Sequence, residues 1–122
     1  MAVILTGPDT QKLVLSASYK WLITLADTDL TGVTITKIQA HFKPVNPDHT
    51  AFTKNSTDDS DWLAIVSATL WTFNILIPLS PSDIPTGDSV WQVEFSAEDA
   101  TRRWIYDLGS WSFVTPKTGL FS

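Results

Sequence analysis

The sequence of 122 residues contains no cysteine. A disulfide framework, a thiolate zinc site and a cysteine nucleophile are therefore all excluded. Charged residues are also scarce, at 17%, whereas apolar residues make up 43%, and disordered chains show the reverse balance. The chain is thus expected to bury a core of its own in a single domain over residues 1–122.

Basic residues are few as well, because eight Lys and Arg stand against thirteen Asp and Glu, for a net charge of −5. Nucleic-acid binding uses clustered cations to neutralise phosphates, so no nucleic-acid partner is expected. No run approaches the ~18 apolar residues of a membrane-spanning helix. The short apolar run at residues 2–5 also lacks the basic start of a signal peptide. We therefore expect no membrane partner.

Motifs for catalysis and cofactor binding are missing too. Neither GxxxxGK[ST] nor GxGxxG occurs, so no phosphate-binding loop is expected. His41 is expected to point to solvent from a strand, and His49 follows Asp48 in a loop, so neither lies near a credible nucleophile. The Gly109-Ser110 pair lacks the second glycine of a nucleophile elbow. We expect a protein that is not an enzyme and that needs no cofactor.

Alternation of large apolar residues with smaller or polar ones is the dominant pattern. Its cleanest case is WQVEFS at residues 91–96, in which every second residue is large and apolar. Successive side chains of a strand point to opposite faces, so each such run gives a strand with one apolar face. No apolar stripe with helical spacing lasts for 12 residues, and the sequence therefore predicts an all-β protein. Strands are expected at residues 12–17, 19–26, 33–43, 62–67, 70–78, 89–97, 102–107 and 110–115.

Eight short strands separated by turn signals suggest an antiparallel sandwich or a small barrel. The predicted strand 33–43 changes phase near Thr36-Lys37, so either a bulge lies there or the strand crosses between sheets. Residues 44–61 lack a strong pattern and are interpreted as a long loop, with room for a short edge strand around residues 50–52.

Three carboxylates, those of Asp58, Asp59 and Asp61, lie within four residues of this loop. Oxygen ligands of this kind bind Ca²⁺, but the EF-hand spacing with its central Gly and terminal Glu is absent. We favour the alternative, an acidic loop tip that keeps the protein soluble. No metal is therefore expected, and the three residues are weak calcium candidates.

Six tryptophans are the most unusual feature of the composition. Five of them lie in the apolar phase of their strands and are expected in the core: Trp21, Trp71, Trp91, Trp104 and Trp111. Trp62, which follows the acidic cluster, is ambiguous. An exposed aromatic ring can anchor a protein interface or stack on a sugar. Trp62 and the 44–61 loop are therefore the candidate site of an alternative function, that of a carbohydrate-binding module.

Both ends of the chain carry apolar residues outside the clear strands. The first ten residues, with Val3, Ile4 and Leu5, are interpreted either as an arm that adds a strand to a neighbour's sheet or as a strand of their own domain. Leu120 and Phe121 are candidate contacts or part of a frayed end. These five residues are candidate interface positions, as is the ambiguous tryptophan.

The order of several short motifs resembles a known family. DLTG at residues 29–32 precedes VTI, IPLS at 77–80 leads to IPTG at 84–87, and VWQVEF follows at 90–95. RW at 103–104 and GSWSFVTP at 109–116 complete the order. Over roughly residues 11–116, the chain is similar to the N-terminal immunoglobulin-like domain of tailed-phage baseplate upper proteins and related tail and decoration proteins.

This resemblance implies a single antiparallel immunoglobulin-like β-sandwich of about seven to eight strands. It also implies a non-enzymatic structural role in the virion, in the tail, the baseplate or the capsid decoration. The expected partners are other virion proteins and further copies of the chain, with a trimer or hexamer as the homo-oligomer. A host glycan is a further candidate partner. The six tryptophans have no obvious counterpart in the family pattern.

Overall fold

The structure is a computed structural model that describes residues 3–15, 17–79 and 81–116. Its strands form two sheets, so the predicted all-β sandwich class is confirmed. Within the described residues, no helix is long and apolar enough to cross a membrane.

Sheet A is the smaller sheet, with four strands in the order β1-β3-β7-β6. These strands are β1 (Val3–Thr6), β3 (Tyr19–Leu25), β7 (Thr72–Ile77) and β6 (Leu63–Ser67). All three pairings between neighbours are antiparallel. A short 3-10 turn, η1 (Thr28–Leu30), follows β3.

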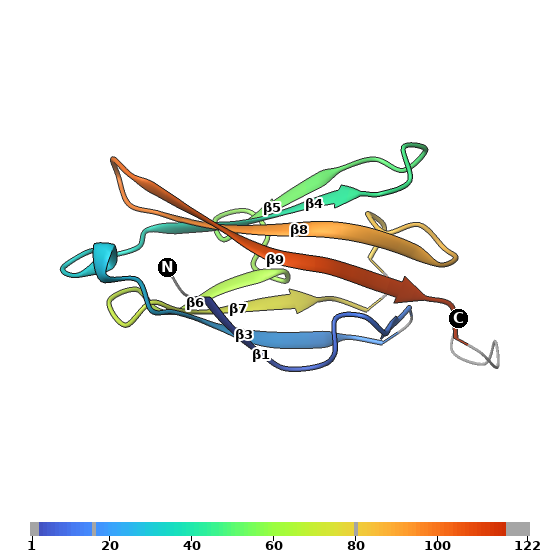
Figure 1. The fold of residues 1–122 in the computed structure, drawn as a ribbon, viewed down its shortest axis with the longest axis horizontal. Helices are drawn as coiled ribbons and strands as arrows, with labels where there is room; N and C mark the ends of the chain where they lie inside the picture. Colours follow the sequence, from blue (N-terminus) through green and yellow to red (C-terminus); the bar gives the residue numbers. More distant parts are fainter. Residues whose placement is uncertain (1–2, 16, 80, 117–122) are drawn as a thin grey trace.

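Sheet B has five strands in the order β2-β9-β8-β4-β5. They are β2 (Leu13–Val14), β9 (Arg103–Val114), β8 (Ser89–Glu98), β4 (Lys37–Pro44) and β5 (Phe52–Asn55). The short β2 pairs parallel with β9, and the other neighbours pair antiparallel. Figure 1 shows the two sheets stacked as layers, with β4, β5, β8 and β9 in the upper layer and β1, β3, β6 and β7 in the lower one.

The core lies between the sheets, where the apolar rows of the strands meet. The rings of Trp21 on β3 and Trp111 on β9 are 4.5 Å apart between centroids, and those of Phe73 and Phe95 are 5.5 Å apart. All four side chains are at most 1% exposed. The prediction of a core position is thus confirmed for Trp21, Trp91 and Trp111, whereas Trp71 and Trp104 are half-buried at the margin of the core.

The predicted strands 102–107 and 110–115 are a single strand, β9. Gln92 pairs with Ser110 but Glu94 pairs with Asp107, so two residues of β9 lie opposite one residue of β8. This arrangement is a β-bulge, and Gly109 within it has a φ of 81°, in the left-handed region that suits glycine. The bulge inverts the phase of alternation along β9, and the sequence pattern therefore resembled two separate strands.

The predicted strand 33–43 begins only at Lys37. The N–H of Ile35 donates to Ala68 O, in the turn between β6 and β7 of sheet A. The next N–H, that of Thr36, donates to Glu98 O at the end of β8 in sheet B. The chain therefore crosses between the sheets at residues 35–36. The change of phase in the predicted strand results from this crossing, and not from a bulge.

Candidate functional site

The N-terminal strand β1 belongs to the chain's own domain. It pairs with β3, with Ile4 opposite Thr24 and Leu5 opposite Ile23. Val3 and Leu5 pack against the core, whereas Ile4 is 53% exposed on the outer face of sheet A. Residues 3–6 are therefore a strand of their own domain, as one of the two interpretations of the N-terminal residues held, and they do not form an arm for a neighbour's sheet. The candidates Leu120 and Phe121 lie outside the described residues.

Trp62 is a core residue, not an exposed anchor. Its side chain is 3% exposed, and its ring makes edge contacts with Phe42 and Phe52 at centroid distances of 5.7 and 5.5 Å. The ammonium group of Lys54 lies 5.1 Å from the same ring. Trp62 therefore offers no free face to a sugar, and the candidate glycan site lacks the exposed ring that was expected to stack on the sugar. Sequence alternation could not place Trp62, because it directly follows a turn.

The acidic residues Asp58, Asp59 and Asp61 lie in a turn that follows β5. Asp59 Oδ2 accepts the Asn55 N–H at 3.0 Å, and Asn55 Oδ1 accepts the Asp58 N–H at 2.9 Å. Within the described ranges, no three acidic or histidine side chains are grouped so that they could hold a metal ion. The cluster therefore forms the turn that ends β5. This edge strand divides the loop expected at 44–61, and it lies at Phe52–Asn55 where the sequence suggested residues 50–52.

Sheet A carries almost no charge. Its four strands contain a single charged residue, Lys20, and no Asp or Glu. The five strands of sheet B contain seven charged residues: Lys37, Lys43, Lys54, Glu94, Glu98, Arg103 and Asp107. The strands of sheet A thus contain no acidic residue, although the protein as a whole is anionic.

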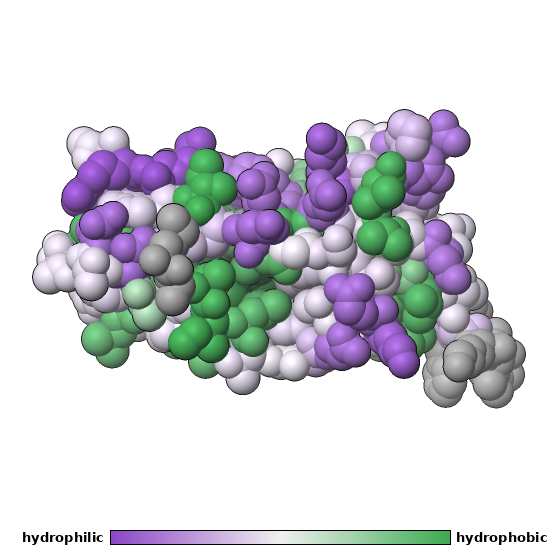
Figure 2. Space-filling view, in the orientation of Figure 1, coloured by the Kyte–Doolittle hydropathy of each residue, from purple (hydrophilic) through white to green (hydrophobic). Residues whose placement is uncertain are grey.

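The outer face of sheet A combines this lack of charge with exposed aliphatic groups. Leu22, 39% exposed, lies at the middle of the sheet, opposite Thr6 on β1 and Asn74 on β7. Ile4 lies on the neighbouring edge strand, and Val66, 55% exposed, lies at a bulge on the other edge. Figure 2, which looks at the edge of the sandwich, shows apolar residues gathered near the β1 edge of the lower layer. Uncharged faces with exposed aliphatic side chains are typical of protein contacts.

The outer face of sheet B carries a shallow polar hollow at the β9 bulge. The carboxylates of Glu94 and Asp107 lie on neighbouring strands in direct register, with His41 opposite Glu94 on the other side. Asp107 Oδ1 accepts the Gly109 N–H at 2.8 Å, which fixes the bulge. The hollow has a volume of about 340 Å³ and is lined by His41, Lys43, Gln92, Glu94, Asp107, Gly109 and Ser110.

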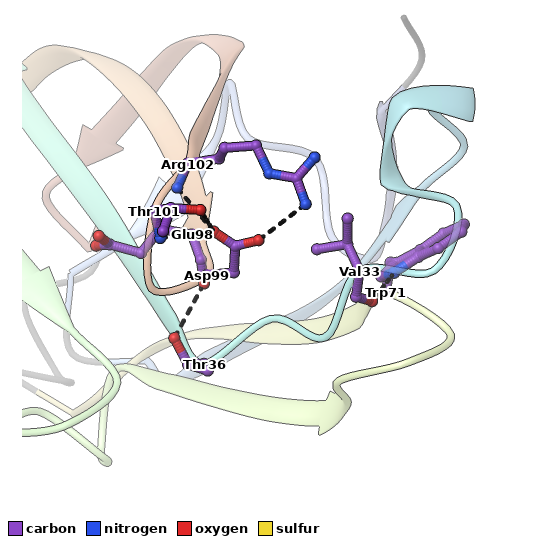
Figure 3. A network of polar contacts seen from close by, with 7 residues as sticks. All are labelled: Val33, Thr36, Trp71, Glu98, Asp99, Thr101 and Arg102. Carbon is purple, nitrogen blue, oxygen red and sulfur yellow. Dashed lines mark hydrogen bonds and ion pairs between the residues drawn. The ribbon is translucent and has the colours of Figure 1, made fainter.

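The polar contacts at one end of the sandwich hold turns together. Figure 3 shows Asp99 accepting the N–H groups of Thr101 and Arg102, at 2.9 and 2.7 Å. These donors lower the pKa of the Asp99 carboxyl. In the same view, the Trp71 Nε1–H donates to Val33 O at 3.1 Å. These contacts hold the turns of this end in place.

The sequence patterns did not single out the residues that distinguish the two outer faces. Lys20, Leu22, Glu94 and Asp107 all lie in the polar phase of their strands, which is normally only solvated surface. The available signal was the absence of acidic residues from that phase in residues 19–25 and 72–77. The chain matches no model of a known protein family and no curated protein sequence.

Proposed function

We propose that this chain is a non-enzymatic structural component of a tailed-phage virion, in the tail, the baseplate or the capsid decoration, and that it acts through protein–protein contacts. The order of its turn and strand motifs, which resembles that of phage tail and decoration domains, supports the virion role. The observation that carries the role in assembly is the outer face of sheet A.

That face suits a contact with another protein for an electrostatic and a hydrophobic reason. The chain has a net charge of −5, so two such molecules, or this molecule and another acidic one, repel each other through most of their surfaces. The strands of sheet A contribute no carboxylate. Burial of Ile4, Leu22 and Val66 there would remove exposed aliphatic surface from water without desolvating a carboxylate on the strands of sheet A.

The proposal is tested on particles of a phage from which the chain's own gene has been deleted. A tagged chain supplied in the host should sediment with purified particles in a density gradient. Leu22→Asp should lower the amount on the particles strongly, because it places a carboxylate in the middle of the contact face. Val45→Asp is the matched control, since Val45 is a 60% exposed aliphatic residue outside sheet A.

Absence of the wild-type chain from the particles would contradict the virion role. Equal amounts of the Leu22→Asp and Val45→Asp variants on the particles would contradict the use of the sheet A face. Melting temperatures of both variants, measured first, ensure that only folded proteins are compared.

A further inference from the structure

The lone charge of sheet A has a chemical counterpart on sheet B. Lys20 is exposed on the otherwise uncharged outer face of β3. On sheet B, Glu94 and Asp107 lie directly opposite each other in the pairing of β8 with β9. Like charges in register destabilise a sheet unless a cation lies between them. Among the described residues, the ion pairs use other groups, so neither of these carboxylates has a cationic partner within 4 Å.

The carboxylates also border a space of suitable size. The hollow of about 340 Å³ at the β9 bulge is lined by both of them and by Gln92 and Ser110. Lys43 and His41 line its other side, so the hollow is bordered by two carboxylates and the ammonium group of one lysine. A lysine side chain, with its flexible stem and compact charge, can enter such a space.

The apolar groups beside these charges are spaced alike on the two faces. Leu22 lies two residues beyond Lys20 on β3, and Ile105 lies two residues before Asp107 on β9. Residues two apart in a strand point to the same side, about 6.6–6.8 Å apart. Leu22 and Ile105 are 39% and 56% exposed. When β3 of one molecule is laid antiparallel on β9 of another, a lysine that meets the carboxylates also brings Leu22 over Ile105.

We propose that one copy of this chain docks the outer face of its sheet A on the outer face of sheet B of a second copy, with Lys20 in the hollow beside Glu94 and Asp107 and with Leu22 on Ile105. This contact uses different surfaces on the two copies, so it repeats from copy to copy and closes into a ring or extends as a filament. It deepens the proposed function, on which it rests, by naming the partner as a second copy.

The test is a charge exchange, read out as the molar mass of the purified full chain by light scattering at several concentrations. The wild-type chain should associate, and Lys20→Glu should raise the dissociation constant by about tenfold or more, because it sets three carboxylates against one another. Glu94→Lys should have a similar effect. The double variant Lys20→Glu/Glu94→Lys should associate again, since the pair is restored with reversed sign.

Glu94 is exchanged in preference to Asp107, because Asp107 also fixes the bulge through the Gly109 N–H. The control is Lys12→Glu, which makes the same charge change at an exposed residue outside the strands. This variant should associate like the wild type. Added salt should weaken the wild-type contact, because it screens charge pairs.

Three outcomes would overturn the proposed contact. These are a wild-type chain that stays monomeric at every concentration, a Lys20→Glu variant that associates like the wild type, and a double variant that fails to recover. In each case the particle experiment with Leu22→Asp still decides the proposed function, because a contact of sheet A with a different virion protein needs no second copy.

Discussion

The inner faces of the two sheets are alike, but their outer faces differ. Both inner faces present large apolar rings, such as Trp21 from sheet A and Trp111 from sheet B, which meet in the core. Outside, sheet B alternates charged residues in the usual way of a solvated surface, whereas sheet A has one lysine. The core requires only that inner residues be apolar, so it does not explain why acidic residues are missing from the outside of sheet A. The proposed contact, in which sheet A meets the carboxylates of sheet B of a second copy, would explain it.

The largest expected effect separates the two sides of a single strand. Trp21→Ala should lower the free energy of unfolding by about 3–5 kcal/mol, because it leaves a cavity against Trp111. The loss should be at the upper end, since the Trp21 Nε1–H also donates to Pro8 O at 2.7 Å. Leu22→Ala, one residue further on, should cost less than about 0.5 kcal/mol in the monomer.

Urea unfolding at low protein concentration measures both changes. A large loss for Leu22→Ala under these conditions would mean that Leu22 contributes to the fold itself. The contrast between the inner and outer sides of sheet A would then be wrong.

The next effect concerns a hydrogen bond between a residue of sheet B and the loop that follows β3 of sheet A. Tyr106 on β9 is 2% exposed, and its hydroxyl donates to Asp27 Oδ2, in the loop after β3, at 3.4 Å. Burial, and then the negative charge of Asp27, raise the pKa of Tyr106 to about 12. Because the folded-state pKa lies above the ordinary value near 10, the stabilisation is complete below pH 10 and is lost as the pH rises through about 12.

The free energy of unfolding should therefore fall by about 2–3 kcal/mol more between pH 10 and 12 in the wild type than in Tyr106→Phe. Phenylalanine cannot ionise, so this variant reports the effect of all other groups over the same range. Parallel pH profiles of the two proteins would show that the fold does not raise the pKa of Tyr106.

The smallest effects are expected from the ion pairs of sheet B. Lys54 on β5 pairs at 2.8 Å with Asp83, which lies in the connection between β7 and β8, and their side chains are 16% and 31% exposed. Asp83→Asn should cost about 1 kcal/mol. Glu98→Gln, which breaks the more exposed pair with Arg103, should cost less than about 0.5 kcal/mol.

Thermal unfolding of both variants in low and high salt checks this order. A larger loss for Glu98→Gln would mean that exposed charges support sheet B more than the covered pair does. The charged outer face would then have a structural purpose.

The parts of the fold that depend on regular alternation could be predicted from the sequence. Residues 19–25 and 91–96 are strands because their period of two continues without interruption over the whole run. Trp62 could not be placed, because a residue next to a turn has no phase, and its burial depends on Phe42 and Phe52 from two other strands. The short strand β5 was only suggested, since its pairing with β4 comes from tertiary structure.

The candidate contact surface was predictable in part. Ile4 was singled out as an interface position for its place near the N-terminus, and it lies on the outer face of sheet A for a different reason, its pairing with β3. Lys20 and Glu94 are ordinary residues in the sequence. Only the fold puts them on opposite outer faces, where a second copy can bring them together.

The bulge in β9 acts on the strand as a frameshift acts on a coding sequence. Before it, Tyr106 faces the core; after it, Trp111 and Phe113 do, so the inward positions change from even to odd numbers. Because five positions separate Tyr106 from Trp111, a strand with regular alternation would turn these two rings to opposite faces of the sheet. The extra residue of the bulge is therefore what allows both aromatic side chains to reach the core from one continuous strand.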